Sequence, residues 1–326
     1  MDSVGYVSPF VPPEWIAAHG LRPAWLTLDG READLPEGAR RGTCPFAAAL
    51  IVEALSGSAA GALVLATSCD QMRYAAAYLD AHCRVPTFLL NVPSTWQTPQ
   101  SRRLYREELD RLGGFLAARG GRPPMPERLA ATLLRYDEHR AAALRARPAM
   151  PAGQWSRTLI ALRSDLATLP EVKASPAAGI PLALVGGPQP AGDARLLERV
   201  ERAGGRIVLD ASEGGERTLP APFDRRRLAA DPLDELVRAY FDTIPDAFRR
   251  PNTRLYEWLA HHLAARGVRG ILFRRYLFCD LWNAELHRLR RQSGLPVLAL
   301  DLAAGDDRET DRSLGRIEAF LETLTL

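Results

Sequence analysis

The sequence predicts an α/β protein in which two Rossmann-like, doubly wound parallel-sheet domains are joined by a helical connector. Three observations support this fold class. Short apolar segments alternate with longer amphipathic segments in the first and the last third of the chain, which is typical of parallel sheets covered by helices. The middle third has an almost wholly helical pattern. A strand-and-turn pattern of the first third recurs in the last third with the same internal spacing.

The short apolar segments are predicted to be buried parallel strands. Each is apolar on both faces and is bounded by Gly, Pro or Asp, as expected for a strand that helices cover on both sides. In chain order these segments are Ala24–Leu28, Ala62–Ala66, Thr87–Val92, Leu182–Val185, Arg206–Leu209, Gly270–Phe273 and Val297–Leu300.

The amphipathic segments between these strands are predicted to be helices. They are Pro45–Leu55, Gln71–Ala81, Ala194–Ala203, Leu233–Asp242, Tyr256–Ala265 and Leu281–Gln292. The helical pattern of the middle third is interrupted near residues 120–124 and 148–153, and residues 170–181 have the Ala, Ser and Pro content of a linker. These patterns place an N-terminal α/β domain at 1–122, a helical connector at 123–175 and a C-terminal α/β domain at 176–326.

Composition and charge exclude several classes of function. The 326 residues are 47% hydrophobic and 25% charged, so the chain can bury substantial cores without disulfides or a structural metal. With 42 basic and 39 acidic residues and a net charge of +3, it lacks the strong positive charge of a nucleic-acid-binding protein. Lys173 is the only lysine and has no glycine near it, which excludes a P-loop and disfavours Schiff-base chemistry.

The N-terminal residues and the hydropathy pattern predict a cytoplasmic protein. The first six residues have neither the basic start nor the apolar run of a signal peptide. No segment approaches the roughly 18 consecutive apolar residues that a membrane span needs. In the cytoplasm, Cys44, Cys69, Cys83 and Cys279 are expected to stay reduced, because disulfides rarely persist there.

A cysteine–aspartate turn occurs at equivalent places in the two α/β regions. One strand segment is followed by Cys69-Asp70 and another by Cys279-Asp280. Pro86 and Pro296 follow the two cysteines at the same spacing of 17 residues and open the next strand segment. Ligands of parallel sheets bind at the carboxyl ends of the strands. We therefore expect both thiols to project into the cleft between the domains.

Cys44 is a third candidate because it also precedes a predicted helix, in the sequence Gly42-Thr-Cys-Pro45. The positive end of a helix dipole lowers the pKa of a nearby thiol. The sequence therefore predicts thiolate character for Cys44, Cys69 and Cys279. Cys83 lies at the end of a predicted helix, where the dipole has the opposite sign, and is predicted to be structural.

The residues alone leave two roles open for the three thiols. Free cysteines are often simply small buried residues, and in that case the chain is a small-molecule-binding α/β protein whose cysteines only pack. Alternatively the thiols bind a metal. Three thiols without a neighbouring histidine favour soft-ligand chemistry, that is, zinc or an iron–sulfur cluster. A cluster on three thiolates leaves one iron free for a substrate oxygen.

A series of short motifs extends over nearly the whole chain. They are Pro12-Pro-Glu-Trp-Ile-Ala-Ala-His-Gly20, Cys44-Pro45, Ser68-Cys69-Asp70, Tyr105-Arg-Glu-Glu-Leu109, Gly204-Gly-Arg-Ile-Val-Leu-Asp210, Asp231-Pro-Leu233, Phe278-Cys279-Asp280, Gly294-Leu-Pro296 and Arg316-Ile-Glu-Ala-Phe-Leu-Glu322. In their order and spacing the chain resembles the 2-hydroxyacyl-CoA dehydratase and benzoyl-CoA reductase family, and within it the subunits like the D-component of 2-hydroxyglutaryl-CoA dehydratase.

The resemblance implies that Cys44, Cys69 and Cys279 hold a [4Fe-4S] cluster between the two domains. It also implies two protein partners, a related sister subunit and an ATP-hydrolysing iron–sulfur activator that supplies a low-potential electron. The implied substrate is an acyl-CoA thioester that reacts through a ketyl radical, either losing a hydroxyl group or undergoing reduction of an aromatic ring. Nucleic acids and membranes are not expected partners.

Two roles are open for the chain within such a complex. It is either a catalytic subunit or a subunit that holds the cluster without turning over substrate, as a non-catalytic partner or electron relay.

An arginine pair is a candidate for binding the phosphates of coenzyme A. Arg274-Arg275 follows a strand segment and precedes Cys279, and arginine side chains are well suited to phosphate groups.

Overall fold

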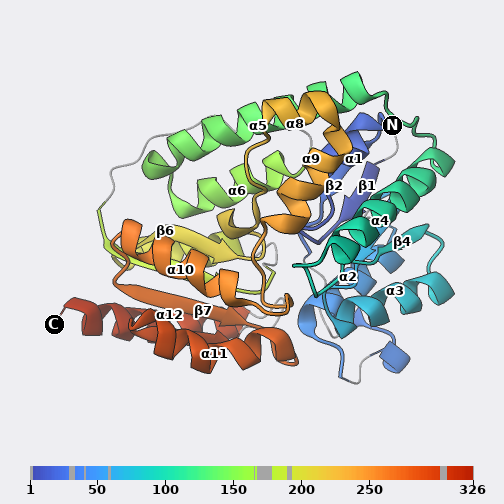
Figure 1. The fold of residues 1–326 in the computed structure, drawn as a ribbon. Coiled ribbons are helices and arrows are strands. Elements are labelled where there is room, and N and C mark those ends of the chain that lie inside the picture. The colour runs from blue at the N-terminus through green and yellow to red at the C-terminus, as the bar shows by residue number, and fades with distance from the viewer. Residues whose placement is uncertain are drawn as a thin grey trace.

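The computed structural model describes residues 3–28, 34–39, 42–57, 60–164, 166, 178–188, 193–301 and 307–325. Within these residues there are two four-stranded sheets, and all neighbouring strands are parallel. Helices cover both faces of each sheet (Figure 1). The predicted fold class is therefore confirmed. Most of the predicted linker, residues 170–177, and Lys173 within it lie outside the described residues.

The first sheet consists of β1 (Ser3–Tyr6), β2 (Arg22–Trp25), β3 (Ala62–Ala66) and β4 (Thr87–Leu90) in the spatial order β2-β1-β3-β4. The chain starts in the middle of the sheet, builds outwards to β2 and then crosses to the other side. The connection that follows β1 leads to one side of the sheet, and the connection that follows β3 leads to the other side. Such a switch point between two neighbouring strands forms a ligand crevice at the carboxyl edge of the sheet.

Helices lie on both faces of this first sheet. On one face α2 (Pro45–Leu55) and α3 (Asp70–His82) pack against the strands, and on the other face α1 (Pro13–Ala18) and α4 (Pro99–Ala118) do so. The residues of β3 divide between the cores on the two faces of the sheet. Leu63 and Leu65 pack in the core with α2 and α3, whereas Val64 and Ala66 pack in the core with α1 and α4. This division explains why the β3 sequence is apolar without alternation.

The second sheet repeats the topology of the first. Its strands β5 (Ile180–Gly186), β6 (Gly205–Ser212), β7 (Gly270–Arg275) and β8 (Val297–Asp301) have the order β6-β5-β7-β8. The switch point therefore lies between β5 and β7. Because β3 and β7 hold the same place in their sheets, the cysteine–aspartate repeat of the sequence corresponds to a repeat of the fold.

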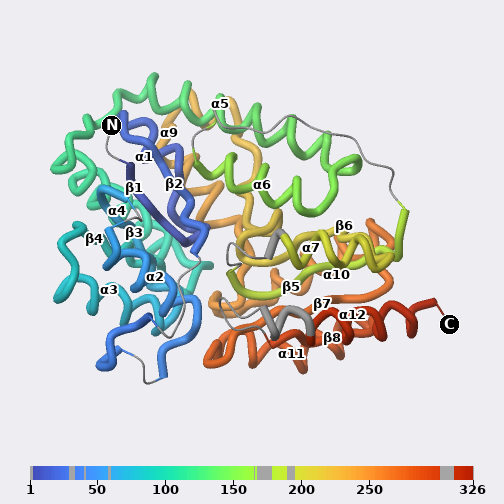
Figure 2. The backbone as a smooth tube through the Cα atoms, turned by 180° about the vertical axis from the view of Figure 1, so that it is seen from behind, coloured from blue at the N-terminus to red at the C-terminus, as the bar shows by residue number. Residues whose placement is uncertain are grey.

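Helices also form a layer on each face of the second sheet. One face is covered by α10 (Thr253–Ala265) and α11 (Asp280–Ser293), and the other by α7 (Asp193–Arg202) and α12 (Asp307–Thr325). Seen from behind, α7 and α12 lie in front of these strands, and α2 and α3 lie beside the first sheet (Figure 2).

The middle of the chain is helical, as predicted, with α4 followed by α5 (Pro126–Ala146) and α6 (Ala152–Leu162). Helix α5 packs on α1 in the first domain, and α6 packs on α7 and β6 in the second. A buried network strengthens the first contact, because Glu14 of α1 accepts hydrogen bonds from Arg140 of α5 and, at 2.7 Å, from the Tyr240 hydroxyl. The connector therefore contacts both domains.

The chain returns to the first domain after β6. The returning segment contains α8 (Arg225–Ala230), α9 (Pro232–Val237) and the π-helical turn η6 (Arg238–Asp242), and its apolar residues join the core beside α1 and α4. Short 3-10 turns lie elsewhere, at η2 (Glu37–Ala39), η3 (Arg147–Ala149) and η5 (Glu216–Thr218). The three predicted domain ranges remain predictions and do not include this return.

The structure differs from the prediction in the presence and the bounds of several elements. Strand β1 was not predicted, because Ser-Val-Gly-Tyr is too short and too mixed to form an apolar run. The strand predicted at Ala24–Leu28 begins at Arg22 instead, since the parallel register pairs Ser3 with Arg22. The helix predicted over Leu233–Asp242 is divided into α9 and η6, where the hydrogen-bond period lengthens.

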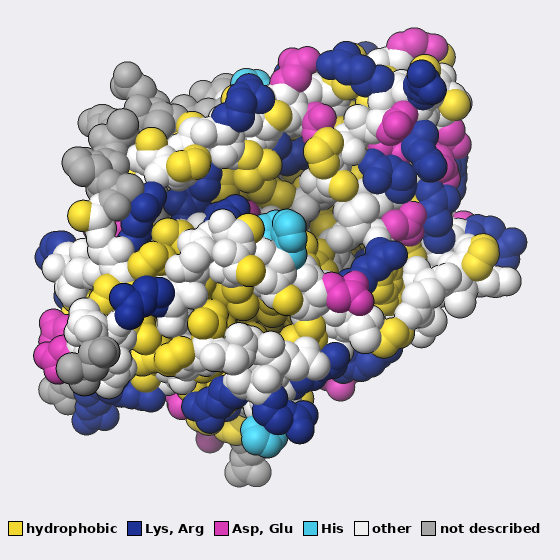
Figure 3. Space-filling model, turned by 60° about the vertical axis from the view of Figure 1, so that its left-hand side comes forward, with side chains coloured by type: hydrophobic (Ala, Val, Ile, Leu, Met, Phe, Trp, Pro, Cys, Tyr) yellow, Lys and Arg dark blue, Asp and Glu magenta, His cyan; other side chains and the backbone are white. Residues whose placement is uncertain are grey.

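The charged side chains on the surface are mixed in sign. Figure 3 shows arginines interspersed with acidic side chains across one face rather than a continuous field of one charge. Ion pairs account for part of this mixing, as between Arg102 and Asp234 at 2.7 Å and between Arg106 and Asp231 at 2.9 Å. None of the helices in the described ranges combines the length and the apolar character needed to cross a bilayer.

Candidate functional site

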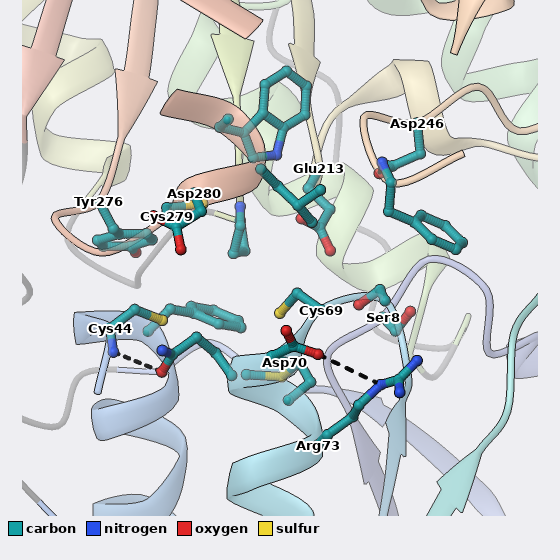
Figure 4. A pocket seen from close by; sticks show the side chains of 18 of the residues that line it. Ser8, Cys44, Cys69, Asp70, Arg73, Glu213, Asp246, Tyr276, Cys279 and Asp280 are labelled. Atoms are coloured by element: carbon teal, nitrogen blue, oxygen red, sulfur yellow. Dashed lines mark hydrogen bonds and ion pairs between the residues drawn. The ribbon is translucent and has the colours of Figure 1, made fainter. Parts of the chain in front are cut away.

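A cavity of about 480 Å³ lies where the carboxyl edges of the two sheets face each other. Cys44, Cys69 and Cys279 all line this cavity. In Figure 4, Cys44 and Cys69 lie on the side formed by the N-terminal domain, and Cys279 lies on the opposite side with the C-terminal domain. The structure therefore brings together the three thiols that the sequence singles out. Their role as ligands remains a prediction.

Cys44 is fixed by its place at the start of α2. It is the N-cap residue, and its Sγ accepts a hydrogen bond from the backbone N–H of Ala47 at 3.4 Å. The side chain of Gln71 from α3 holds the turn, accepting from Cys44 N at 2.8 Å and donating to Gly42 O at 2.9 Å. Gln71 thus acts as a positioning residue that couples the starts of α2 and α3.

Cys69 and Cys279 occupy equivalent positions in the two domains. Each is the N-cap residue of the helix that follows the third strand of its sheet, α3 for Cys69 and α11 for Cys279. The backbone N–H groups of the first helical turn, of Met72 beside Cys69 and of Trp282 beside Cys279, act to lower the pKa of these thiols, although neither sulfur accepts a capping hydrogen bond as Cys44 does. Three helix starts therefore place three thiols around one cavity.

The turn before Cys279 is strained. Phe278 has a φ of 62°, which is the left-handed region that a residue with a side chain rarely adopts. Its ring lines the cavity and is nevertheless 46% exposed, and the neighbouring Leu277 is 64% exposed. Such strain is characteristic of functional sites, where the surrounding structure imposes an unfavourable conformation.

The prediction of lowered thiol pKa values is wrong for the metal-free chain. Burial raises the pKa of Cys44 to about 11 and those of Cys69 and Cys279 to about 12. The backbone N–H groups at the helix starts do act to lower these values, as expected. Their effect is smaller than the cost of withdrawing a thiolate from water at these buried positions. A bound cation would reverse this balance.

The raised thiol pKa values predict how the stability of the metal-free chain depends on pH. The ordinary pKa of a cysteine thiol is 9.0. Above that pH the unfolded chain therefore loses thiol protons that the folded chain still holds. The free energy of unfolding should therefore be unaffected by these groups below pH 9. It should fall as pH rises from 9 towards 12, by up to about 1.4 kcal/mol per pH unit for each thiol.

Urea unfolding of the metal-free chain between pH 8 and 11 measures this slope. Buried tyrosines such as Tyr105, whose pKa burial also raises, add a slope of their own. The informative quantity is therefore the difference between the wild-type chain and Cys69→Ala, which should have the shallower slope. Equal slopes would show that Cys69 keeps its ordinary pKa in the fold.

Cys83 lies away from the cavity, in agreement with its predicted structural role. It follows the last residue of α3, and its thiol donates a hydrogen bond to Ala54 O at 3.3 Å. Its side chain packs against the core between α2 and α3 and is not among the residues that line the cavity.

The three thiols are not arranged to share a single ion. Across the described ranges, no three His, Cys, Asp or Glu side chains lie close enough together to hold one metal ion. A preformed zinc site would need such a group, with each sulfur about 2.3 Å from the ion. An iron–sulfur cluster instead binds each cysteine through a different iron, so its ligands stand further apart. The donor set around the cavity is compatible with a cluster.

Several cavity residues were not predicted. Ser8 follows β1 and Glu213 follows β6, so both lie at the carboxyl edges of strands, and Asp246 lies in the returning segment. Burial, together with the negative charge of Asp246, raises the pKa of the Glu213 carboxyl to about 8. The strand-end rule points to Ser8 and Glu213 only once β1 and the full length of β6 are known, because β1 was not predicted and the predicted strand ends at Leu209, before the end of β6. Asp246 follows no strand, and no comparable signal marks it.

A buried ion pair supports the C-terminal wall of the cavity. Arg217 pairs with Asp246 at 2.9 Å and donates to the carbonyl oxygens of Ala211 and Pro245. Its guanidinium also stacks over the ring of Trp282, 5.1 Å from the ring centre. This one side chain therefore ties the end of β6, the returning segment and the first turn of α11 together.

The arginine pair proposed for coenzyme A phosphates is engaged within the fold. Arg274 is fully buried and donates to the carbonyl oxygen of Pro188 at 2.6 Å. Arg275 forms an ion pair with Asp301 at the end of β8. Arg274 cannot meet a phosphate without unfolding its surroundings, so the prediction is wrong for this residue.

Comparisons with known proteins bear on the family and not on the fold. None of the curated proteins searched matches the chain. Among solved structures, the solute-binding protein FpvC from Pseudomonas aeruginosa, in complex with Mn²⁺, is similar at 12% identity over 100% of this chain and 99% of that one, with a TM-score of 0.26. A mutant of the laminin-binding adhesin Lmb from Streptococcus agalactiae is similar at 11% identity over 99% of each chain, with a TM-score of 0.25. At such TM-scores neither similarity informs the argument.

The family comparison is specific. The model of the 2-hydroxyglutaryl-CoA dehydratase D-component matches residues 9–324, which is nearly the whole chain. All three cavity cysteines lie within that match. The chain belongs to the 2-hydroxyglutaryl-CoA dehydratase D-component family.

Proposed function

We propose that this chain is the cluster-holding subunit of an acyl-CoA dehydratase or aromatic acyl-CoA reductase, with a [4Fe-4S] cluster on Cys44, Cys69 and Cys279. The observation that carries the proposal is the convergence of three helix-start thiols on one cavity. Membership of the dehydratase D-component family supports the same reading. The cytoplasm is the compartment we propose.

When bound, such a cluster supplies a single electron and an iron that can bind a substrate oxygen. The chain's own residues prepare the place for it. Gln71 fixes the Cys44 turn, and the backbone N–H groups at the helix starts stabilise negative charge on sulfur. Phe46, Phe248 and Trp282 contribute apolar side chains to the wall of the cavity.

The rest of the cavity suits the acyl end of a thioester. Its volume of about 480 Å³ lies in the range of small-molecule sites. The Ser8 hydroxyl accepts a hydrogen bond from Phe10 N at 3.3 Å, so its own proton can be donated to a bound carbonyl oxygen. Arg73 and Arg250 line the cavity and are exposed, and we assign them to the phosphates of coenzyme A.

A reconstituted complex tests this function. The chain would be combined anaerobically with its sister subunit, an ATP-hydrolysing iron–sulfur activator and candidate substrates, namely 2-hydroxyacyl-CoA thioesters and benzoyl-CoA. We expect turnover that needs ATP and is lost in Cys279→Ala. A complex that carries iron in this chain, accepts electrons and turns over none of these thioesters would contradict a catalytic role.

The second candidate function is electron relay by a non-catalytic subunit. The observation that favours it is the position of the Glu213 carboxyl, which faces the cysteines where a substrate oxygen would have to bind (Figure 4). The two functions differ in substrate binding: only the catalytic subunit should bind acyl-CoA in the cavity.

A further inference from the structure

One aromatic side chain of the second domain is buried in a core of the first. Tyr276 follows β7, yet its ring packs in the core that contains α2 and α3, and the residue is only 1% exposed. The other buried members of that core, among the residues that the structure describes, all lie between Val7 and Leu79. Neighbouring domains tend to move relative to each other unless an apolar contact holds them together. Tyr276 provides one such contact.

This contact joins the two turns that carry cysteines on opposite walls of the cavity. The Tyr276 ring lies against Phe46, with the ring centres 6.1 Å apart, which is within the usual range for an aromatic pair. Phe46 is the second residue after Cys44, in the first turn of α2. The backbone N–H of Cys279 donates to Tyr276 O at 3.2 Å, and Figure 4 shows Tyr276 beside Cys279 and opposite Cys44. One residue therefore links the backbone of Cys279 to the helix start that holds Cys44.

Arg274 supports the Tyr276 ring from within the second domain. Its guanidinium lies 4.5 Å from the centre of the ring, within the distance of a cation–π contact. Arg274 is itself fixed, because it is fully buried and donates to Pro188 O at 2.6 Å. It also pairs with Gly186 where the two central strands of the sheet, β5 and β7, lie side by side. Arg274 therefore connects Tyr276 to the middle of the second sheet.

We propose that Tyr276, supported by Arg274, is a positioning residue that holds Cys279 at a fixed separation from Cys44 and Cys69. The inference rests on the proposed function of the three cysteines. A group that binds to two domains at once binds more weakly when it must first bring them together. The buried ring already orders the two walls in the metal-free chain. Without it, the connector and the returning segment still join the domains, but Cys279 can move away from the other two thiols.

Bifunctional thiol reagents of increasing length measure this separation in the metal-free full-length chain. Mass spectrometry then counts the bridged peptides that join Cys279 to Cys69 and, as an internal reference, those that join Cys44 to Cys69 within the first domain. In Tyr276→Ala, the ratio of the first to the second should fall by about fivefold or more. Tyr276→Phe, which keeps the ring, should stay within about twofold of the wild-type ratio, and Arg274→Met should lie between the two.

Leu79→Ala is the matched control. Leu79 is fully buried in the same core but lies in α3 and does not line the cavity. The variant weakens that core by opening a cavity in it and should leave the bridging ratio at the wild-type value. An unchanged ratio in Tyr276→Ala, or an equal fall in Leu79→Ala, overturns the proposal. If Tyr276→Ala does not fold, Tyr276→Leu, which loses the ring but keeps an apolar side chain, decides the question in the same way.

The rate of iron loss gives a second readout. After anaerobic reconstitution, we expect a chelator to remove iron from Tyr276→Ala about tenfold faster than from the wild-type chain, and from Tyr276→Phe at the wild-type rate. Equal rates in Tyr276→Ala and the wild-type chain would also overturn the proposal. Failure of the proposed function looks different, because the wild-type chain would then hold no iron, while the bridging ratio would still show whether Tyr276 positions Cys279.

Discussion

Replacing Cys279 by Ala should abolish iron binding. A [4Fe-4S] cluster on three cysteines loses the only thiol that the C-terminal domain contributes, and the two remaining thiols both come from the other wall of the cavity. We expect the iron content after anaerobic reconstitution to fall from about four per chain to near zero. Cys44→Ala and Cys69→Ala should behave in the same way, as measured by iron and sulfide assays on each purified variant.

Cys83→Ala is the matched control for this loss. It removes the remaining cysteine of the chain, whose thiol bonds to Ala54 O and lies outside the cavity. Its iron content should equal that of the wild-type chain. If Cys83→Ala loses iron while Cys279→Ala keeps it, the ligand set is wrong.

Replacing Arg217 by Ala should cause a large loss of stability. Asp246 would remain buried without its ion-pair partner, and the carbonyl oxygens of Ala211 and Pro245 would lose their donor. Removing one member of a buried pair costs about 3–5 kcal/mol. The midpoint of urea unfolding should shift accordingly, and the near-ultraviolet signal of Trp282, which stacks on Arg217, should change in the folded state.

Two further variants make this expectation specific to the buried pair. Arg103→Ala removes an arginine that is 74% exposed and pairs with Glu107 on the surface, and it should cost less than about 1 kcal/mol. The double variant Arg217→Met with Asp246→Leu should recover much of the loss, because no unpaired charge is left buried. If Arg217→Ala costs no more than Arg103→Ala, the pair does not support the cavity wall.

The sequence was sufficient for the elements that depend on local patterns. Strand β3 and helix α2 begin and end where the apolar runs and flanking residues predict. The recurrence of a cysteine–aspartate turn at one spacing predicted two equivalent strand–turn–helix units, and both sheets indeed have the same strand order. Because parallel strands direct their following turns to one edge, the same pattern predicted that Cys69 and Cys279 would lie near each other.

What the sequence did not predict depends on contacts between distant segments. Strand β1 lies in the middle of its sheet although its four residues carry no distinctive pattern. The pKa values of the thiols are set by burial among side chains from both domains, and no helix-start argument contains that contribution. Glu213 and Asp246 reach the cavity only because β6 ends at its wall and the chain then returns across it.

The proposed function depends above all on a four-iron cluster held by Cys44, Cys69 and Cys279. Mössbauer spectroscopy of the full-length chain, reconstituted anaerobically with ⁵⁷Fe and assayed for iron and sulfide, tests it most directly. We expect about four iron and four sulfide per chain, with the spectrum of a [4Fe-4S] cluster that has one iron distinct from the other three. A chain that takes up no iron under these conditions, or binds only a single metal ion, would contradict it.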